Sequence, residues 1–420
     1  MEYFEIQGGK RLKGEIEVRG SKNATTPILA ATLLTKERCV ISNIPLIEDV
    51  FRLLEILESM GVEIKWLGKR KISVEAKNIN TAKMDFEKVK TLRSSILLLG
   101  SLSARFPKFK LYHPGGCVIG ARPMGTHFDA LAKMGVQTKQ NGKFYSIDAR
   151  KRKSASIALK EFSVTGTENA MMLAAGLPGK TIIKIAAAEP HVEDLGNFLI
   201  KMGAKIKGLG THTLEITGAK KLKGASHVII SDPVEAATFL IMGVATKSRI
   251  KVKNAREDHL DLVLEKLKEF GANFKITKNY IEVIPPKKIN SVQKVEARTY
   301  PGIPTDAQAP FGVLATQAQG KTLIYDTLYE GRLNYVQGIK KMGAKTKIID
   351  NHQMLVEGPT KLKGRIINSY DLRAGASLII AALVAEGKTI IENIYQVDRG
   401  YERIEERLQK LGADIKRISN

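Results

Sequence analysis

Cysteine and aromatic residues are scarce in this chain of 420 residues. It has 2 cysteines, Cys39 and Cys117, and its aromatic content is 6%. Two cysteines supply neither a metal-ligand pattern nor a disulfide framework, so each thiol is interpreted singly. No apolar run approaches the roughly 18 residues that indicate a membrane span, and the charged N-terminal segment MEYFEIQGGKRLKGEIEV lacks the apolar core of a signal peptide. We therefore expect a cytoplasmic protein with reduced cysteines and no membrane span.

Acidic residues are too few to balance the basic ones. The 43 Asp and Glu stand against 67 Lys and Arg, and the formal net charge is +24. Such a charge attracts nucleic acid, anionic surfaces or anionic substrates. The lysines are scattered along the chain, and the sequence has no zinc-finger, RRM or basic-helix pattern. We expect a generally basic surface and no nucleic-acid partner.

A short phrase recurs six times along the chain. Its copies are MGVEI, MGVQT, MGAKI, FGANF, MGAKT and LGADI, with glycines at 61, 135, 203, 271, 343 and 412. Each copy ends a segment with helical spacing of apolar residues, such as Val50, Leu53, Leu54 and Leu57. The glycine suits the position just past a helix end, where a left-handed backbone angle favours Gly. The near-constant period predicts a repeat architecture.

Each repeat also contains strands and a second, more apolar helix. β-branched runs such as KTIIKIAA and RIKVKNA precede the amphipathic helices. Stretches rich in Ala and Gly, such as ATTPILAATLLT and AGASLIIAALVAEG, are apolar nearly all round, so we expect them in domain centres with sheets outside. The length predicts two domains, and therefore three repeats in each. We assign residues 22–230 to the first and residues 1–21 with 231–420 to the second.

The two cysteines have different surroundings. Cys39 lies in the strand-like segment ERCVISNI, which predicts a buried structural thiol. Cys117 follows two glycines in HPGGCVIGARP, which predicts an exposed loop. A nearby cation such as Arg122 favours the thiolate, so reactivity is possible there.

Polar residues collect where the repeat pattern is broken. GSKN places Lys22 and Asn23 after a glycine and before a buried helix, where an anion is favoured. A solvated lysine and an N-cap asparagine are the alternatives. Asp306, in GIPTDAQAP, is either an N-cap or a proton acceptor for a substrate hydroxyl.

Five arginines occupy comparable positions. They are Arg93, Arg122, Arg332, Arg373 and Arg399. Each alone is compatible with surface decoration. Because guanidinium groups bind phosphate and carboxylate by paired hydrogen bonds, the set indicates a small substrate that carries both groups.

Five signatures follow one another along the chain: GSKNATTPILAATLL, GGCVIGARP, PTDAQA, DLRAGASL and DRGYERIEERLQKLGA. With them the chain resembles the enolpyruvyl transferase family from residue 1 to 420, and within it the branch that acts on UDP-N-acetylglucosamine in peptidoglycan precursor synthesis. The resemblance implies an EPSP synthase-like α/β fold of two similar inside-out α/β barrel domains, each with three repeats, buried helices and outer sheets. It also implies that substrates bind in the cleft between the domains, with the cysteine loop closing as a lid.

The resemblance implies transfer of the enolpyruvyl group of phosphoenolpyruvate to the 3′-hydroxyl of UDP-N-acetylglucosamine, with release of phosphate. Cys117 would protonate the methylene carbon, and it would be alkylated by fosfomycin. Asp306 would accept the hydroxyl proton, while Lys22, Arg122 and Arg399 would hold phosphoenolpyruvate. No cofactor and no metal is implied.

The implied substrate-binding residues cluster in a few segments. They are Lys22, Asn23, Arg93, Arg122, Pro123, Met124, Gly125, Thr126, Glu161, Phe162, Ser163, Val164, Asp306, Leu328, Arg332, Asp371, Arg373 and Arg399.

Five positions depart from the usual pattern of this branch: Gly125, Glu161, Ala188, His191 and Pro233. They fall on nucleotide-binding and hinge-side elements, so we expect unchanged chemistry and an altered nucleotide affinity. Two alternatives stay open. The sister branch acting on shikimate 3-phosphate lacks the cysteine loop, and a non-catalytic binder of anionic polymers has no use for an exposed thiol.

Overall fold

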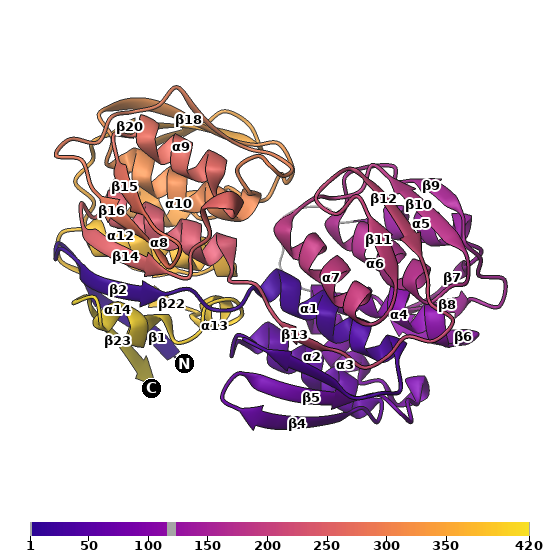
Figure 1. Ribbon diagram of the computed structural model, residues 1–420. Coiled ribbons are helices and arrows are strands. Elements are labelled where there is room, and N and C mark those ends of the chain that lie inside the picture. Colours follow the sequence, from indigo (N-terminus) through magenta and orange to yellow (C-terminus); the bar gives the residue numbers. More distant parts are fainter. Residues whose placement is uncertain (1, 116–122, 420) are drawn as a thin grey trace. The chain divides into compact units, whose positions relative to one another are not determined.

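The computed structural model describes residues 2–115 and 123–419 (Figure 1). These residues divide into two compact units. The first unit contains residues 20–115 and 123–230, and the second contains residues 2–19 and 231–419.

Three sheets build the first unit. Its strands are β3 Cys39–Ser42, β4 Glu63–Gly68, β5 Lys71–Glu75, β6 Lys108–Tyr112, β7 Gln137–Asn141, β8 Phe144–Asp148, β9 Ser156–Ala158, β10 Lys180–Lys184, β11 Lys205–Lys207, β12 Thr213–Thr217 and β13 Ser226–Val228. Its helices are α1 Lys22–Ala31, α2 Glu48–Ser59, α3 Phe86–Thr91, α4 Leu98–Arg105, α5 Gly125–Lys133, α6 Val164–Ala175 and α7 Pro190–Lys201, with 3-10 turns η1 Thr32–Leu34, η2 Thr81–Lys83 and η3 Arg93–Leu97. The strand orders are β13-β3-β5-β4, β6-β8-β7 and β11-β12-β10-β9.

Three further sheets build the second unit. Its strands are β1 Glu2–Gln7, β2 Lys13–Glu17, β14 Arg249–Lys253, β15 Asn273–Ile276, β16 Tyr280–Ile284, β17 Lys294–Ala297, β18 Gly320–Asp326, β19 Lys345–Ile348, β20 Gln353–Gly358, β21 Ile366–Asn368, β22 Lys388–Glu392 and β23 Asp414–Ser419. Its helices are α8 Pro233–Ala245, α9 Asp261–Glu269, α10 Thr305–Thr316, α11 Val336–Lys341, α12 Leu372–Val384, α13 Tyr395–Asp398 and α14 Ile404–Gln409, with a 3-10 turn η4 Glu257–His259. The strand orders are β21-β22-β1-β23, β15-β16-β14-β2 and β17-β18-β20-β19.

The small-residue helices form the centre of each unit, as the sequence predicts. In the second unit α8, α10 and α12 pack against one another (Figure 1), and every residue of α8 after its opening proline is buried. In the first unit α1, α4 and α6 have the same character. A helix that is apolar on all sides is stable only when other elements cover it on all sides. Both units combine such central helices with three sheets, so the predicted mixed α/β fold is confirmed. Among the described residues each sheet is open, so the barrel closure remains a prediction.

The repeat glycines have the predicted conformation. Gly61, Gly135, Gly203, Gly271, Gly343 and Gly412 all have φ between +81° and +113°. In each repeat the residue after the glycine donates its N–H to the last helical turn, as Val62 does to the carbonyl of Leu57 at 3.2 Å. This pattern is the Schellman motif, which explains why glycine recurs at the end of each amphipathic helix.

The connections from the first strand of a repeat to its amphipathic helix differ in length. After β3 and β10 they are short, residues 43–47 and 185–189. After β18 and β22 they are longer, residues 327–335 and 393–403. The longer connections contain Leu328 and Arg332, and Arg399 respectively. Loops built on a rigid scaffold commonly carry functional residues.

None of the described helices combines the length and the apolar composition needed to cross a membrane.

Candidate functional site

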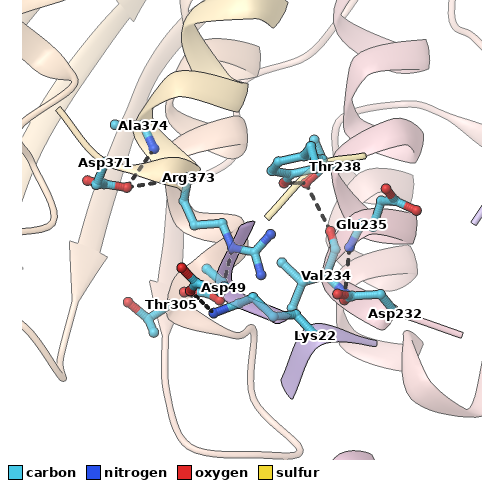
Figure 2. A network of polar contacts seen from close by, with 12 residues as sticks. Lys22, Asp49, Asp232, Val234, Glu235, Thr238, Thr305, Asp371, Arg373 and Ala374 are labelled. Atoms are coloured by element: carbon cyan, nitrogen blue, oxygen red, sulfur yellow. Dashed lines mark hydrogen bonds and ion pairs between the residues drawn. The ribbon is translucent and has the colours of Figure 1, made fainter. Parts of the chain in front are cut away.

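Lys22 is a partly buried side chain with a carboxylate partner in the first unit. Its Nζ lies 3.4 Å from Asp49 Oδ2 (Figure 2), and the Lys22 side chain is 18% exposed. The interpretation of Lys22 as a solvated loop lysine is therefore wrong. Sequence reasoning missed Asp49, although one signal was present. Asp49 lies four residues before Leu53, so this acid falls on the apolar face of α2.

The start of α1 is shaped by Gly20 and Ser21. A Cβ on Gly20 would lie 1.8 Å from the carbonyl oxygen of Asn43, so only glycine fits there. Ser21 is the N-cap, since its hydroxyl accepts a hydrogen bond from the N–H of Ala24 at 3.3 Å. The N-cap interpretation of Asn23 is therefore wrong. Asn23 is half-buried in the first helical turn beside Lys22, where the helix end favours an anion.

Residues His113 and Gly115 precede the segment that contains Cys117, and they lie against Tyr145 and Lys90 near Arg93. The Tyr145 hydroxyl and His113 Nδ1 are 2.9 Å apart. Burial raises the pKa of Tyr145, while the positive charge of Arg93 opposes this shift. A Cβ on Gly115 would lie 1.5 Å from the carbonyl oxygen of Lys90, so this glycine permits a close approach.

Cys117 and Arg122 lie outside the described residues. Cys39 is free and fully buried, which confirms its predicted structural character. Burial raises the pKa of the Cys39 thiol, so the reactive thiolate is disfavoured there.

The predicted segments 123–126 and 161–164 meet at the starts of α5 and α6. Thr126 donates its hydroxyl hydrogen bond to Glu161 Oε1 at 2.7 Å. His127 Nε2 and the Thr165 hydroxyl are 2.8 Å apart, and the Ser163 hydroxyl caps α6. Two helix N-termini with hydroxyl side chains therefore lie together, an arrangement suited to oxygen-rich ligands.

The remaining residues of these segments differ in exposure. Pro123 and Gly125 are exposed, and Met124 is buried. Phe162 is 47% exposed and makes an edge contact with His212. Val164 begins α6 and is half-buried. An exposed aromatic ring beside two helix starts offers a surface for a planar group.

Asp306 is the centre of the charged cluster in the second unit. Arg332 Nη2 donates to Asp306 Oδ1 at 2.5 Å, and Arg373 Nε donates to Asp306 Oδ2 at 3.0 Å. Asp306 is the second residue of α10, whose N-cap is Pro304. The N-cap interpretation of Asp306 is therefore wrong, and its carboxylate instead joins two guanidinium groups.

Arg373 is almost completely buried, with 2% of its side chain exposed. Burial alone lowers the pKa of Arg373, but Asp306, Tyr401 and Asp232 raise it above its ordinary value. The guanidinium carbon lies 5.3 Å from the centroid of the Tyr401 ring. Burial raises the pKa of Asp232, and the charge of Arg373 opposes that shift. The cluster therefore holds a permanent buried cation.

Asp371 acts on Arg373 through the backbone. Its Oδ1 accepts hydrogen bonds from the N–H groups of Arg373 and Ala374 at 2.8 and 3.0 Å (Figure 2). Its Oδ2 accepts from Asn334 at 2.6 Å. Asp371 is thus a buried helix cap, whose acceptor capacity is used largely within the protein.

Asp326 connects the start of α10 with the Leu328 turn. Its Oδ1 accepts the N–H groups of Leu328 and Tyr329, both at 2.9 Å. Its Oδ2 accepts from the Thr305 hydroxyl, which belongs to the residue just before Asp306. Leu328 is 37% exposed, whereas Asp326 is fully buried. Sequence reasoning missed Asp326, because a single acid at the end of a strand gives little signal.

Arg399 is the C-cap of the short helix α13 Tyr395–Asp398 and is 8% exposed. Its Nη1 donates to Gln396 Oε1 at 3.2 Å. Among the described residues, no group of three or more His, Cys, Asp or Glu side chains has the arrangement of a metal site.

The comparisons with known proteins cover nearly the whole chain. The profile of EPSP synthase (3-phosphoshikimate 1-carboxyvinyltransferase) matches residues 6–408. The UDP-N-acetylglucosamine 1-carboxyvinyltransferase of Koribacter versatilis (strain Ellin345) is 42% identical over 424 residues, covering 100% of this chain and 97% of the relative. That of Coxiella burnetii (strain Dugway 5J108-111) is 42% identical over 422 residues, with the same coverage.

Solved structures share the fold. The enolpyruvyl transferase NikO from Streptomyces tendae aligns with a TM-score of 0.89 at 24% identity, covering 100% of this chain and 99% of that one. The EPSP synthase of Acinetobacter baumannii aligns with a TM-score of 0.74 at 19% identity over 100% of both chains. The chain therefore belongs to the EPSP synthase (3-phosphoshikimate 1-carboxyvinyltransferase) family.

Proposed function

We propose that the protein transfers the enolpyruvyl group of phosphoenolpyruvate to the 3′-hydroxyl of UDP-N-acetylglucosamine and releases phosphate. The observation that carries the proposal is the 42% identity, over the full chain, to relatives named for this activity. The Asp306 cluster supports it, because a carboxylate and two guanidinium groups suit the transfer of a proton beside an anion.

The proposed reaction has two stages. Cys117 donates a proton to the methylene carbon of phosphoenolpyruvate, while the sugar oxygen bonds to the neighbouring carbon and passes its proton to Asp306. The product of this addition is a tetrahedral adduct. The Cys117 thiolate then takes a proton from the new methyl group while phosphate departs with the proton held by Asp306, which restores the double bond, now in an enol ether. General acid and base groups of this kind typically contribute about 10²–10⁴-fold each.

The ion pairs of Asp306 define its part in the reaction. Arg332 and Arg373 each donate to one of its two oxygens, so the carboxylate has a fixed position from which it would accept the hydroxyl proton.

Cations in fixed positions would stabilise the adduct. Lys22, Arg122 and Arg399 would hold the phosphate and carboxylate of phosphoenolpyruvate, and Arg93 would contribute further positive charge. Cations that are already oriented stabilise a developing anion without reorganisation of the site. Asp371 would act indirectly, because it caps the helix that presents Arg373.

The nucleotide would contact Asn23 and the segments 122–126 and 161–164. Glu161 is held by Thr126, so its carboxylate has a defined position there. Leu328 would contribute an apolar contact. The departures at Gly125 and Glu161 therefore predict a nucleotide affinity different from that of relatives, with the same chemistry.

The proposal includes the finer architecture and the location. Residues 22–230 would form one inside-out α/β barrel, and residues 1–21 with 231–420 would form the other. A reactive thiol at Cys117 requires a reducing compartment, so the protein would act in the cytoplasm. No cofactor, metal, nucleic acid or membrane is part of the proposed reaction.

Release of inorganic phosphate tests the acceptor directly. The protein is incubated with phosphoenolpyruvate and either UDP-N-acetylglucosamine or shikimate 3-phosphate. We expect phosphate only with the sugar nucleotide. Turnover with shikimate 3-phosphate alone would favour the sister activity, and no turnover with either would favour a non-catalytic binder.

Labelling with fosfomycin tests the thiol separately. We expect one adduct on the peptide that contains Cys117, formed faster with UDP-N-acetylglucosamine present. Cys39→Ala is the matched control, because Cys39 is fully buried, and it should leave the adduct unchanged. Labelling of Cys39 in place of Cys117 would contradict the assignment.

A further inference from the structure

Arg417, three residues from the end of the chain, gathers three carboxylates around one guanidinium. Its Nη1 and Nη2 donate to the two oxygens of Asp398 at 2.9 and 2.6 Å. Its Nε donates to Glu405 Oε1 at 2.7 Å, and Nη1 also donates to Glu2 Oε2 at 2.9 Å. The guanidinium carbon lies 5.1 Å from the centroid of the buried Phe4 ring. The paired hydrogen bonds from Nη1 and Nη2 to the two oxygens of Asp398 fix both the distance and the orientation of this carboxylate.

Three members of the cluster are partly shielded from solvent, whereas the Glu2 side chain is 49% exposed. The side chains of Arg417 and Asp398 are 23% and 22% exposed, and that of Glu405 is 10% exposed. Burial alone lowers the pKa of Arg417, but its hydrogen bonds with Asp398 and Glu405 raise it above the ordinary value. The guanidinium therefore keeps its charge over the whole physiological range.

Asp398 immediately precedes Arg399 in the chain. Asp398 is the last residue of α13, and Arg399 is its C-cap in a helical conformation. Successive side chains on a helical turn diverge, so the carboxylate held by Arg417 and the guanidinium of Arg399 leave the turn in different directions. The contact of Arg399 with Gln396, three residues earlier, agrees with this arrangement.

We propose that Arg417 is a positioning residue for Arg399, because it holds the turn that presents Arg399 and offsets part of the negative charge of the adjacent Asp398. The inference rests on the proposed role of Arg399 in binding phosphoenolpyruvate. Without Arg417, a bare carboxylate one residue from Arg399 repels the incoming anion. The turn also loses the two hydrogen bonds that join Asp398 to Arg417 on β23.

Arg417→Gln tests the charge, because glutamine remains polar but carries no positive charge to offset that of Asp398. We expect the KM for phosphoenolpyruvate to rise about tenfold, which corresponds to ~1.4 kcal/mol of lost binding. The kcat and the KM for UDP-N-acetylglucosamine should change little. Higher salt should reduce the defect, since salt screens repulsion near the surface. Arg249→Gln is the control, because it breaks another arginine–carboxylate pair of the second unit, with Glu282 at 2.8 Å.

Two second-site variants separate a positioning role from a merely structural one. Asp398→Asn and Glu405→Gln are each combined with Arg417→Gln. Each removes one of the carboxylates that have lost their guanidinium partner, so both double variants should have a higher melting temperature than Arg417→Gln alone. Only Asp398→Asn removes the charge beside Arg399. We therefore expect it alone to restore the KM for phosphoenolpyruvate. Equal restoration by both variants, or a parallel rise in both KM values, would overturn the proposal.

Direct binding separates this inference from the proposed function. Phosphoenolpyruvate alone is titrated calorimetrically into the full-length wild type and the same variants. Suppose that the wild type lacks turnover, that Arg417→Gln binds phosphoenolpyruvate more weakly than the wild type, and that only Asp398→Asn restores the affinity. The inference then stands and the proposed transfer is wrong. If the wild type turns over and Arg417→Gln binds phosphoenolpyruvate equally well, the inference is wrong and the proposed function stands. If the wild type neither turns over nor binds phosphoenolpyruvate, both are wrong.

Discussion

Replacement of Asp306 by Asn should damage stability and catalysis together. Asparagine keeps an oxygen in place but removes the charge that faces Arg332 and Arg373 at 2.5 and 3.0 Å. Arg373 has 2% of its side chain exposed, so its charge has little access to water. Breaking a buried pair by removing one partner typically costs about 3–5 kcal/mol. Asp232 continues to offset part of the charge of Arg373, so we expect a loss of about 3 kcal/mol.

The same substitution removes the proposed proton acceptor. We expect kcat to fall by about 10²–10⁴-fold, the usual contribution of a general base. Urea unfolding at neutral pH gives the change in free energy, and phosphate release gives the change in kcat. Asp350→Asn is the control for stability, because Asp350 is an exposed aspartate that accepts the N–H of His352 at 2.7 Å. Its loss should be below about 1 kcal/mol.

Two results would refute this reasoning. An Asp306→Asn protein as stable as the wild type would mean that the buried charge of Arg373 does not depend on Asp306. An Asp306→Asn protein with wild-type kcat would mean that another group accepts the proton. Asp306→Glu distinguishes charge from placement, since it keeps the carboxylate and should retain more stability than Asp306→Asn.

Three further predictions concern other groups. Burial, and then the charge of Glu189, raise the pKa of Glu168 well above 4.5, so the stability that Glu168 contributes is present below pH 4.5 and is lost as pH rises through its folded pKa. Thermal melts at pH 5 and pH 8 should therefore show that Glu168→Gln stabilises more at pH 8, and equal shifts at both would contradict this. Asp326→Ala, which loses the hydrogen bonds to the Leu328 turn, should raise the KM for UDP-N-acetylglucosamine about tenfold, or ~1.4 kcal/mol, with Asp326→Asn less affected in steady-state kinetics. A KM that Asp326→Ala leaves unchanged would remove this role. Cys117→Asp should retain turnover and resist fosfomycin in the phosphate assay, because a carboxyl group still donates a proton, and complete loss of turnover would contradict the proton-donor role.

Much of the fold could be predicted from the sequence. The glycines that end the amphipathic helices, such as Gly61 and Gly412, have the expected positive φ. The small-residue helices are central, and Cys39 is buried. These features follow from local rules, because the glycine conformation and the apolar periodicity depend on residues within one or two turns.

The sequence was less informative about the polar groups. The sequence allowed a solvated lysine at Lys22 and an N-cap at Asn23 and Asp306, and the structure excludes each of these. The sequence alone cannot separate the alternatives, since a helix cap and a charged ligand group use the same residue types at the same positions. Sequence reasoning also missed Asp49 and Asp326, whose partners define their role.

The sequence by itself determined the repeat, the apolar helices and the set of residues available for chemistry. Only the tertiary structure decided the pairing of those residues: Asp49 with Lys22, Arg332 and Arg373 with Asp306, and Arg417 with Asp398. These partners are distant in sequence in most cases, so strand register and helix packing bring them together. Periodicity specifies which face of an element is buried, whereas the match between two faces depends on the whole packed unit.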